Sequence, residues 1–189
     1  MFIQTESTPN PQTVKFLPGQ VVMEQGVAEF KSEDDAKVTP LGRELFRLSG
    51  VESLFFGKDF ISVSKSEDQE WELLKPQVLA IIMQHFTAGL PLFEESYLRS
   101  QDNIQNTANE LHGELEKQII ELIDTRVRPA VAMDGGDIVF DRFEDGVVFL
   151  HMRGACSGCP SSTATLKSGI ENMLKHYVPE VQEVRPAEG

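Results

Sequence analysis

The apolar positions at the start of the chain follow the alternation of β-strands. Residues 2–6 and 13–17 are short β-prone runs, separated by a turn that contains two prolines. Residues 51–56 and 60–65 are β-branched and aromatic runs on either side of a three-residue turn, a pattern typical of a β-hairpin. This part of the chain therefore supplies the strands of one predicted sheet.

Helical spacing of apolar residues appears beside these strands. It predicts a short helix over residues 40–50, with Thr39 in position to cap it. A longer helix is predicted over residues 71–88, with Pro76 in its first turns. Residues 1–88 are thus expected to form one domain.

Polar residues then replace the periodic pattern between residues 89 and 109. The run 100–107 has almost nothing to bury. We expect residues 89–109 to be a flexible linker, which would let the modules on either side move independently.

Residues 110–189 show the periodicity of a second module. A helix limited by Pro129 is expected first, because proline interrupts helix hydrogen bonding. The predicted elements are a helix at 110–127, a hairpin of 138–143 and 147–152, a helix ending near Tyr177, and a short strand near 181–184. The expected fold class is α+β: two small α/β-sandwich-like domains, each with a short, mostly antiparallel sheet packed by helices.

Composition and charge narrow the partners. The 40% of hydrophobic residues predicts a folded chain, and 30 acidic residues against 17 basic ones leave a net charge of −13. Nucleic acid is not expected as a partner, since phosphate binding needs clustered Lys and Arg. A membrane is not expected either, because apolar stretches such as 78–83 are too short to cross a bilayer.

The chain has two cysteines, Cys156 and Cys159. A bridge between them would close too small a loop to stabilise the fold much, which indicates chemistry or metal binding. Gly154 and Gly158 let the backbone wrap closely, so that both sulfurs can face one point. Pro160 begins a helix, whose N-terminal partial charge favours the thiolate form.

Two thiolates cannot complete a four-coordinate site within one chain. His151 is a weak candidate for a further ligand, and a strand position more often serves packing. Symmetry is the simpler solution, with two chains each giving Cys156 and Cys159 to one shared cluster. A thiol–disulfide redox protein and a zinc-bridged dimeric adaptor remain alternatives, although a thioredoxin-like pair would follow an early strand of a βαβ unit.

Other notable residues are interpreted structurally. Residues 134–137 are predicted to form a turn, with Asp134 and Asp137 capping it or facing water. The remaining histidines receive no role. The phenylalanines expected in the core, or in a partner-docking patch where exposed, are Phe55, Phe56 and Phe60.

Motifs in both modules resemble one family. The C-terminal ones are 133–137 (Met-Asp-Gly-Gly-Asp) and 154–160 (Gly-Ala-Cys-Ser-Gly-Cys-Pro). The N-terminal ones are 2–6 (Phe-Ile-Gln-Thr-Glu), 9–11 (Pro-Asn-Pro), 15–19 (Lys-Phe-Leu-Pro-Gly), 55–57 (Phe-Phe-Gly) and 59–61 (Asp-Phe-Ile). Together they closely resemble the NifU-like (Nfu-type) iron–sulfur scaffold proteins, over essentially the whole chain apart from the linker.

The resemblance implies a scaffold or carrier without catalytic turnover. It would bind a [4Fe–4S] cluster between two subunits of a homodimer through Cys156 and Cys159. It would receive the cluster from an upstream donor and deliver it to recipient apo iron–sulfur proteins, with the N-terminal domain engaging partners. The start of the chain lacks an Arg- and Ser-rich segment, so a bacterial cytoplasmic location is expected in preference to a mature mitochondrial one.

Overall fold

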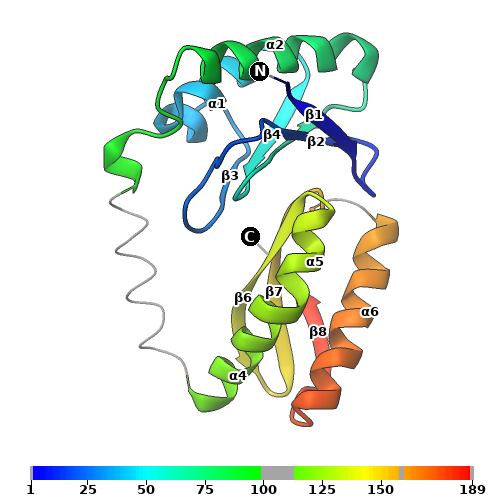
Figure 1. Ribbon diagram of the computed structural model, residues 1–189. Coiled ribbons are helices and arrows are strands. Elements are labelled where there is room, and N and C mark those ends of the chain that lie inside the picture. Colours follow the sequence, from blue (N-terminus) through cyan, green and yellow to red (C-terminus); the bar gives the residue numbers. More distant parts are fainter. Residues whose placement is uncertain (1, 99–112, 158–159, 188–189) are drawn as a thin grey trace.

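The computed structural model describes residues 2–98, 113–157 and 160–187, the last range without the side chains of 160–163. Two α+β units lie one above the other in Figure 1, and each packs helices against a sheet. We refer to residues 2–98 as the N-terminal unit and to residues 113–187 as the C-terminal unit. The expected α+β fold class is confirmed. In the described ranges no helix has the length and apolar character needed to span a membrane.

The N-terminal unit contains a five-stranded antiparallel sheet with the order β1-β2-β5-β4-β3. Its strands are β1 (Gln4–Ser7), β2 (Thr13–Leu17), β3 (Ala28–Phe30), β4 (Val51–Phe56) and β5 (Ile61–Lys65). Its helices are η1 (Asp35–Val38), α1 (Pro40–Phe46) and α2 (Trp71–Thr87). The hairpin and both helices predicted from the sequence are present, and α1 ends earlier than expected.

Alternation along the strands gives this sheet two distinct faces. Leu54 and Phe56 of β4 join the hydrophobic core with α1 and α2, whereas Phe55 between them is buried outside that core. Thr39 caps α1 as predicted, because its Oγ1 accepts a hydrogen bond from the Gly42 N–H at 3.2 Å. We call the face opposite the helices the open face of the N-terminal sheet.

The start of the predicted linker is packed in the structure. Phe93 is buried in the N-terminal core, with its ring 5.4 Å from the rings of both Phe56 and Tyr97. The Glu94 N–H also donates to the Val38 carbonyl at 2.8 Å. Because residues 89–109 are mostly polar, the sequence pattern did not reveal these buried aromatic residues. Their contacts extend the N-terminal unit to at least Leu98.

The C-terminal unit has a three-stranded sheet with the order β6-β7-β8, in which β8 runs parallel to β7. Its strands are β6 (Gly136–Glu144), β7 (Val147–Gly154) and β8 (Glu183–Pro186). Its helical segments are α4 (Glu114–Leu122), η2 (Ile123–Val127), α5 (Arg128–Met133) and α6 (Pro160–Tyr177). The predicted hairpin, last helix and last strand are all present.

Pro129 does not end the first helix of this unit, contrary to the prediction. The helical path continues through η2, a π-helical turn, into α5 and ends at Met133. Pro129 lies in the first turn of α5, where its missing N–H costs little because the π turn has already shifted the hydrogen-bond pattern. The longer path brings the helix end close to the turn at Gly135.

Candidate functional site: the cysteine turn

Cys156 lies between the end of β7 and the start of α6, as the sequence predicts. The residue is 7% exposed and packs against the hydrophobic core of the C-terminal unit. Cys159 lies outside the described residues. Cys156 lies four positions before Pro160, the first residue of the 18-residue helix α6.

The backbone around Cys156 is crowded in a way that only glycine permits. A Cβ atom on Gly136 would lie 2.7 Å from the Cys156 Sγ and 2.7 Å from the Arg153 carbonyl oxygen. Gly154 has a φ of 63°, in the left-handed region that favours glycine. The start of β6 therefore passes directly against the sulfur.

A second glycine turn lies beside the first. Gly135 has a φ of 80°, and its carbonyl accepts a hydrogen bond from the Ala155 N–H at 3.2 Å. This bond joins residues 133–137, which include the turn at 134–135 and the start of β6, to residues 154–157. We call these two segments together the cysteine turn. The two C-terminal motifs therefore form one structure, which was not predicted from their positions in the sequence.

Asp137 is buried, contrary to the expectation that it caps the turn or faces water. Its carboxylate accepts two hydrogen bonds from Arg128, at 2.8 Å from Nε and 3.0 Å from Nη2. Burial opposes the charge of Arg128, but the hydrogen bonds to Asp137 and Asp124 raise the pKa of its guanidinium above the usual range. This ion pair fixes the first residues of β6 to the start of α5.

His151 is engaged away from the cysteine turn. Its Nε2 lies 3.0 Å from the Asp141 Oδ1, on the partly exposed side of the C-terminal sheet. No group of three or more His, Cys, Asp or Glu side chains is arranged to hold a metal ion within the parts of the chain that the structure describes. His151 thus has Asp141 as its side-chain partner.

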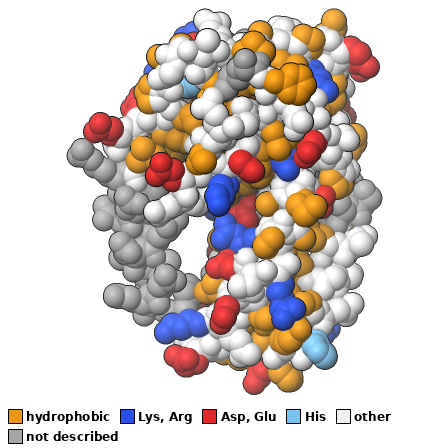
Figure 2. Space-filling view, viewed as in Figure 1, with side chains coloured by type: hydrophobic (Ala, Val, Ile, Leu, Met, Phe, Trp, Pro, Cys, Tyr) orange, Lys and Arg blue, Asp and Glu red, His pale blue; other side chains and the backbone are white. Residues whose placement is uncertain are grey.

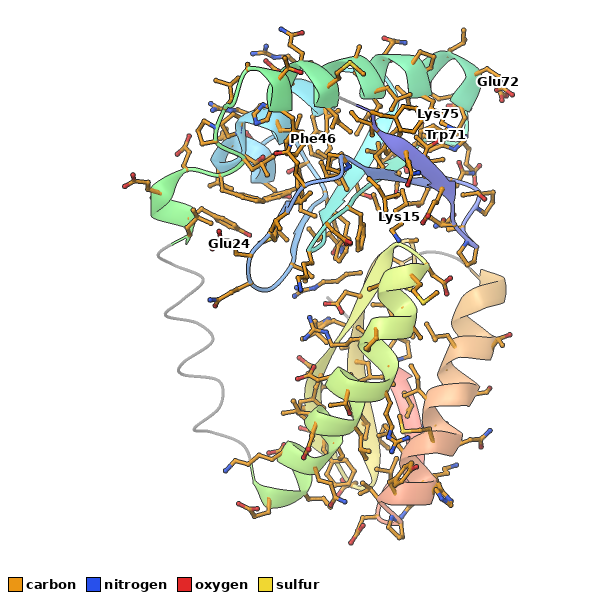
Figure 3. The ribbon with its side chains drawn as sticks, viewed as in Figure 1. Lys15, Glu24, Phe46, Trp71, Glu72 and Lys75 are labelled. Carbon is orange, nitrogen blue, oxygen red and sulfur yellow. The ribbon has the colours of Figure 1, made fainter. Side chains whose placement is uncertain are left out.

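The open face of the N-terminal sheet covers the cysteine turn. The Ser62 Oγ donates to the Gly135 carbonyl at 2.7 Å, and Glu29 Oε1 accepts from the Gly154 N–H at 2.9 Å. Lys15 Nζ donates to the Met133 carbonyl at 3.3 Å, and Figure 3 shows this lysine at the boundary between the two units. Lys15 belongs to the 15–19 motif noted in the sequence. Ser62 and Glu29 were not singled out, although their alternation with core residues was the available signal.

The three phenylalanines are all buried but divide between two environments. Phe56 packs in the N-terminal core, whereas Phe55 and Phe60 lie outside it with their ring centroids 5.9 Å apart. A Cβ atom on Gly154 would lie 2.9 Å from the Phe55 Cγ, so this ring covers the cysteine turn directly. The core interpretation is confirmed for Phe56, and Phe55 contacts the other unit.

Two family models match the chain. Residues 3–89 match the model described as scaffold protein Nfu/NifU N terminal, and residues 119–185 match the NifU-like domain. The chain belongs to the Nfu/NifU family of scaffold proteins. The matches leave a central segment uncovered, and they place the cysteine turn inside the NifU-like match and its covering face inside the other.

Curated relatives in this family match almost the whole chain. The chain is 50% identical over 185 residues to the NFU1 iron-sulfur cluster scaffold homolog, mitochondrial, of Drosophila willistoni, and spans 63% of that protein. It is 48% identical to the protein of the same name from Homo sapiens and spans 71% of it. The matched region includes 97% of this chain in both comparisons. The chain spans less than two thirds of the length of the Drosophila relative.

Solved structures similar to this chain include a NifU-like protein from Saccharomyces cerevisiae, with 24% identity over 50% of this chain and 86% of that chain, at a TM-score of 0.46. Protein SAV1430 from Staphylococcus aureus has 30% identity over 43% of this chain and 99% of that chain, at a TM-score of 0.40.

The expected bacterial cytoplasmic location is wrong, as the names of the relatives indicate. The Drosophila and human relatives are named as mitochondrial proteins. Targeting segments are removed from mature proteins, so the composition of the first residues is a weak guide to location. Sequence identity over nearly the whole chain is the stronger indication.

Proposed function

We propose that this Nfu/NifU family chain is an iron–sulfur cluster scaffold and carrier. Cys156 and Cys159 of each of two chains would hold one [4Fe–4S] cluster, which is the cargo and not a resident cofactor. The chain would take the cluster from an upstream donor and transfer it to apo iron–sulfur proteins, without catalytic turnover of a small substrate. The relatives' names favour a mitochondrial setting.

The proposal rests on the position of Cys156 in this chain, which belongs to the Nfu/NifU family. Its sulfur lies against the glycine backbone at the start of β6, in the turn that precedes α6. Iron–sulfur clusters are usually held by four thiolates. Since the chain has two cysteines, a second copy supplies the remaining ligands.

The proposed sharing also explains why a carrier function suits this site. Each chain contributes two bonds to the cluster, so separation of the two chains exposes it to a recipient protein. A site enclosed within one chain would instead have to open its own fold. Release therefore depends on an association equilibrium, which a partner can shift by binding one chain.

The test is anaerobic reconstitution of wild-type protein with iron and sulfide, followed by iron and sulfide analysis and light-scattering mass. We expect about four irons and four sulfides per two chains. Cys156→Ser and Cys159→Ser should each lose the cluster. Ser157→Ala is the matched control, because it changes the same turn without removing a thiol.

The outcomes distinguish the proposal from its alternatives. Retention of a full cluster by either cysteine variant would contradict it. A colourless dimer that retains zinc would identify the adaptor, and a metal-free monomer whose thiols cycle with glutathione would identify the redox protein. Transfer is tested separately, by adding the loaded dimer to an apo protein and following the iron content of both after separation.

A further inference from the structure

The centre of the open face of the N-terminal sheet is buried, although no helix of its own unit covers it. Phe55 and Ser62 are each 1% exposed, and Lys15 is 7% exposed. An antiparallel sheet with helices on one side commonly presents the other side to water. Here the covering layer is the cysteine turn.

The polar contacts across this boundary end on main-chain atoms of the cysteine turn. Ser62, Lys15 and Asn10 donate to the carbonyls of Gly135, Met133 and Ser157, and Glu29 accepts from the Gly154 N–H. The face therefore recognises the backbone shape of two adjacent glycine turns. Asn10 Nδ2 reaches the Ser157 carbonyl at 3.4 Å, one residue from Cys156.

The contacts of Lys15 indicate that the open face suits a partner that presents main-chain carbonyl oxygens. Its ammonium lies 3.3 Å from the Glu6 carboxylate and 4.8 Å from the centre of the Phe60 ring. Its remaining contact is the carbonyl of Met133, the last residue of α5. Carbonyls at a helix C-terminus carry partial negative charge and favour a cation.

Phe55 provides the apolar part of the contact. Its ring lies against Gly154, where a Cβ atom would come within 2.9 Å of the Phe55 Cγ. Gly154 is therefore required both by its backbone conformation and by the approach of this ring. A side chain at that position would clash both with the Phe55 ring and with the Gly135 carbonyl oxygen, 2.8 Å from the Cβ position in the same unit.

We propose that the open face of the N-terminal sheet is a docking surface for the chain's own cysteine turn. The docked, closed form shields Cys156 in the metal-free protein and competes with the association of two chains across that residue. The competition rests on the proposed function, because it requires Cys156 to hold a shared cluster. The shielding rests on the hydrogen bonds to residues that flank Cys156 and on its 7% exposure, to which the core of its own unit also contributes.

The two associations compete because they need the same surface. Cys156 is 7% exposed in the closed form, and bonds from the N-terminal unit reach Gly135, Gly154 and Ser157 around it. A second chain that shares a cluster must approach the same turn. Loading therefore requires undocking, and the freed open face then becomes available to another protein.

Thiol reactivity of metal-free, full-length protein tests the shielding. In a Cys159→Ser background, the alkylation rate of Cys156 is measured under conditions in which that rate is proportional to the fraction of undocked molecules. Phe55→Ser should accelerate alkylation about tenfold or more, and Glu29→Gln by a smaller factor of about three, since each weakens docking. Phe2→Ser is the matched control, because Phe2 is 80% exposed.

Circular dichroism and thermal unfolding establish that each variant is folded. Glu29→Gln removes one hydrogen-bonding charge without creating a cavity, so it remains a test if Phe55→Ser unfolds. Folded Phe55→Ser and Glu29→Gln proteins with wild-type alkylation rates would overturn the docking surface. Faster alkylation in both, with no change in Phe2→Ser, supports it.

Hydrogen exchange tests the competition. Peptides covering 53–64 and 133–136 should be protected in the metal-free protein and exchange faster in the iron-loaded dimer. Equal protection in both forms would overturn competition while leaving docking intact. If the protein binds no iron but the variants still accelerate alkylation, the carrier function fails and the docking surface stands.

Discussion

The two sheets of this protein differ most in the faces that their own helices leave uncovered. On the C-terminal sheet, that face satisfies its polar groups internally: His151 pairs with Asp141, and the Arg142 guanidinium lies 4.0 Å from the centre of the Phe149 ring. On the N-terminal sheet, Lys15 and Ser62 are buried and bond to the other unit.

The difference shows how the polar groups of a sheet face indicate whether that face contacts water or protein. On a solvent-facing sheet, charged side chains can pair with their neighbours and stay partly exposed. A face that contacts protein must place each buried polar group opposite a complementary one. Figure 2 shows acidic and basic side chains interspersed over the face of the molecule that it draws.

The largest expected effect is at the ion pair that supports the cysteine turn. Arg128→Met should destabilise the C-terminal unit by about 3 kcal/mol, because Asp137 would remain buried without its charged partner. Urea unfolding gives the free energy. The control is Arg142→Met on the exposed face, where little change is expected. Equal losses in the two variants would show that burial of Asp137 does not set the cost.

Matched phenylalanine substitutions compare the two faces directly. Phe55→Ala should cost about 3 kcal/mol of unfolding free energy, whereas Phe149→Ala should cost about 1 kcal/mol. The reason is that Phe55 is 1% exposed against the cysteine turn and Phe149 is only partly buried. Denaturant unfolding of both full-length variants measures the difference. Similar costs would remove the distinction between the faces.

His85 makes the N-terminal unit sensitive to acid. Burial lowers its pKa from 6.5, and the Glu44 carboxylate offsets this only in part. The unfolded state therefore binds a proton that the folded state does not, so stability falls as pH drops below 6.5, by at most about 1.4 kcal/mol per pH unit. His85→Leu should reduce this slope.

Thermal unfolding at several pH values between about 5 and 8 measures the His85 effect. His176→Leu is a suitable control, since His176 is exposed on α6 of the other unit. An unchanged slope in His85→Leu would assign the acid sensitivity to other groups. The C-terminal unit should show no change in either variant.

The smallest effect is expected at His151. His151→Gln should leave iron and sulfide content unchanged and alter the unfolding free energy by about 0.5 kcal/mol or less, because its bond to Asp141 is partly exposed. Iron analysis after reconstitution provides the measurement. Loss of the cluster in this variant would mean that a histidine takes part in cluster binding after all.

Much of the fold could be predicted from local patterns. Alternation identified the β4–β5 and β6–β7 hairpins, and helical spacing identified α2 and α6. The prediction failed where a tertiary contact outweighed local composition. Phe93 lies in a polar segment, but aromatic neighbours bury it. Pro129 would interrupt a regular helix, but a π turn accommodates it.

The sequence by itself determined most of the strands and helices and the position of Cys156 before α6, because these depend on residues that are close along the chain. It did not predict β3, which pairs with β4, or the helical path through Pro129. Only the tertiary structure decided that Asp137 is buried against Arg128 and that the open face of the N-terminal sheet covers the cysteine turn. The contacts between the two units join side chains to main-chain atoms across as many as 147 positions. Every residue has the same backbone groups, so no side-chain pattern along the chain predicts which main-chain atoms the open face contacts.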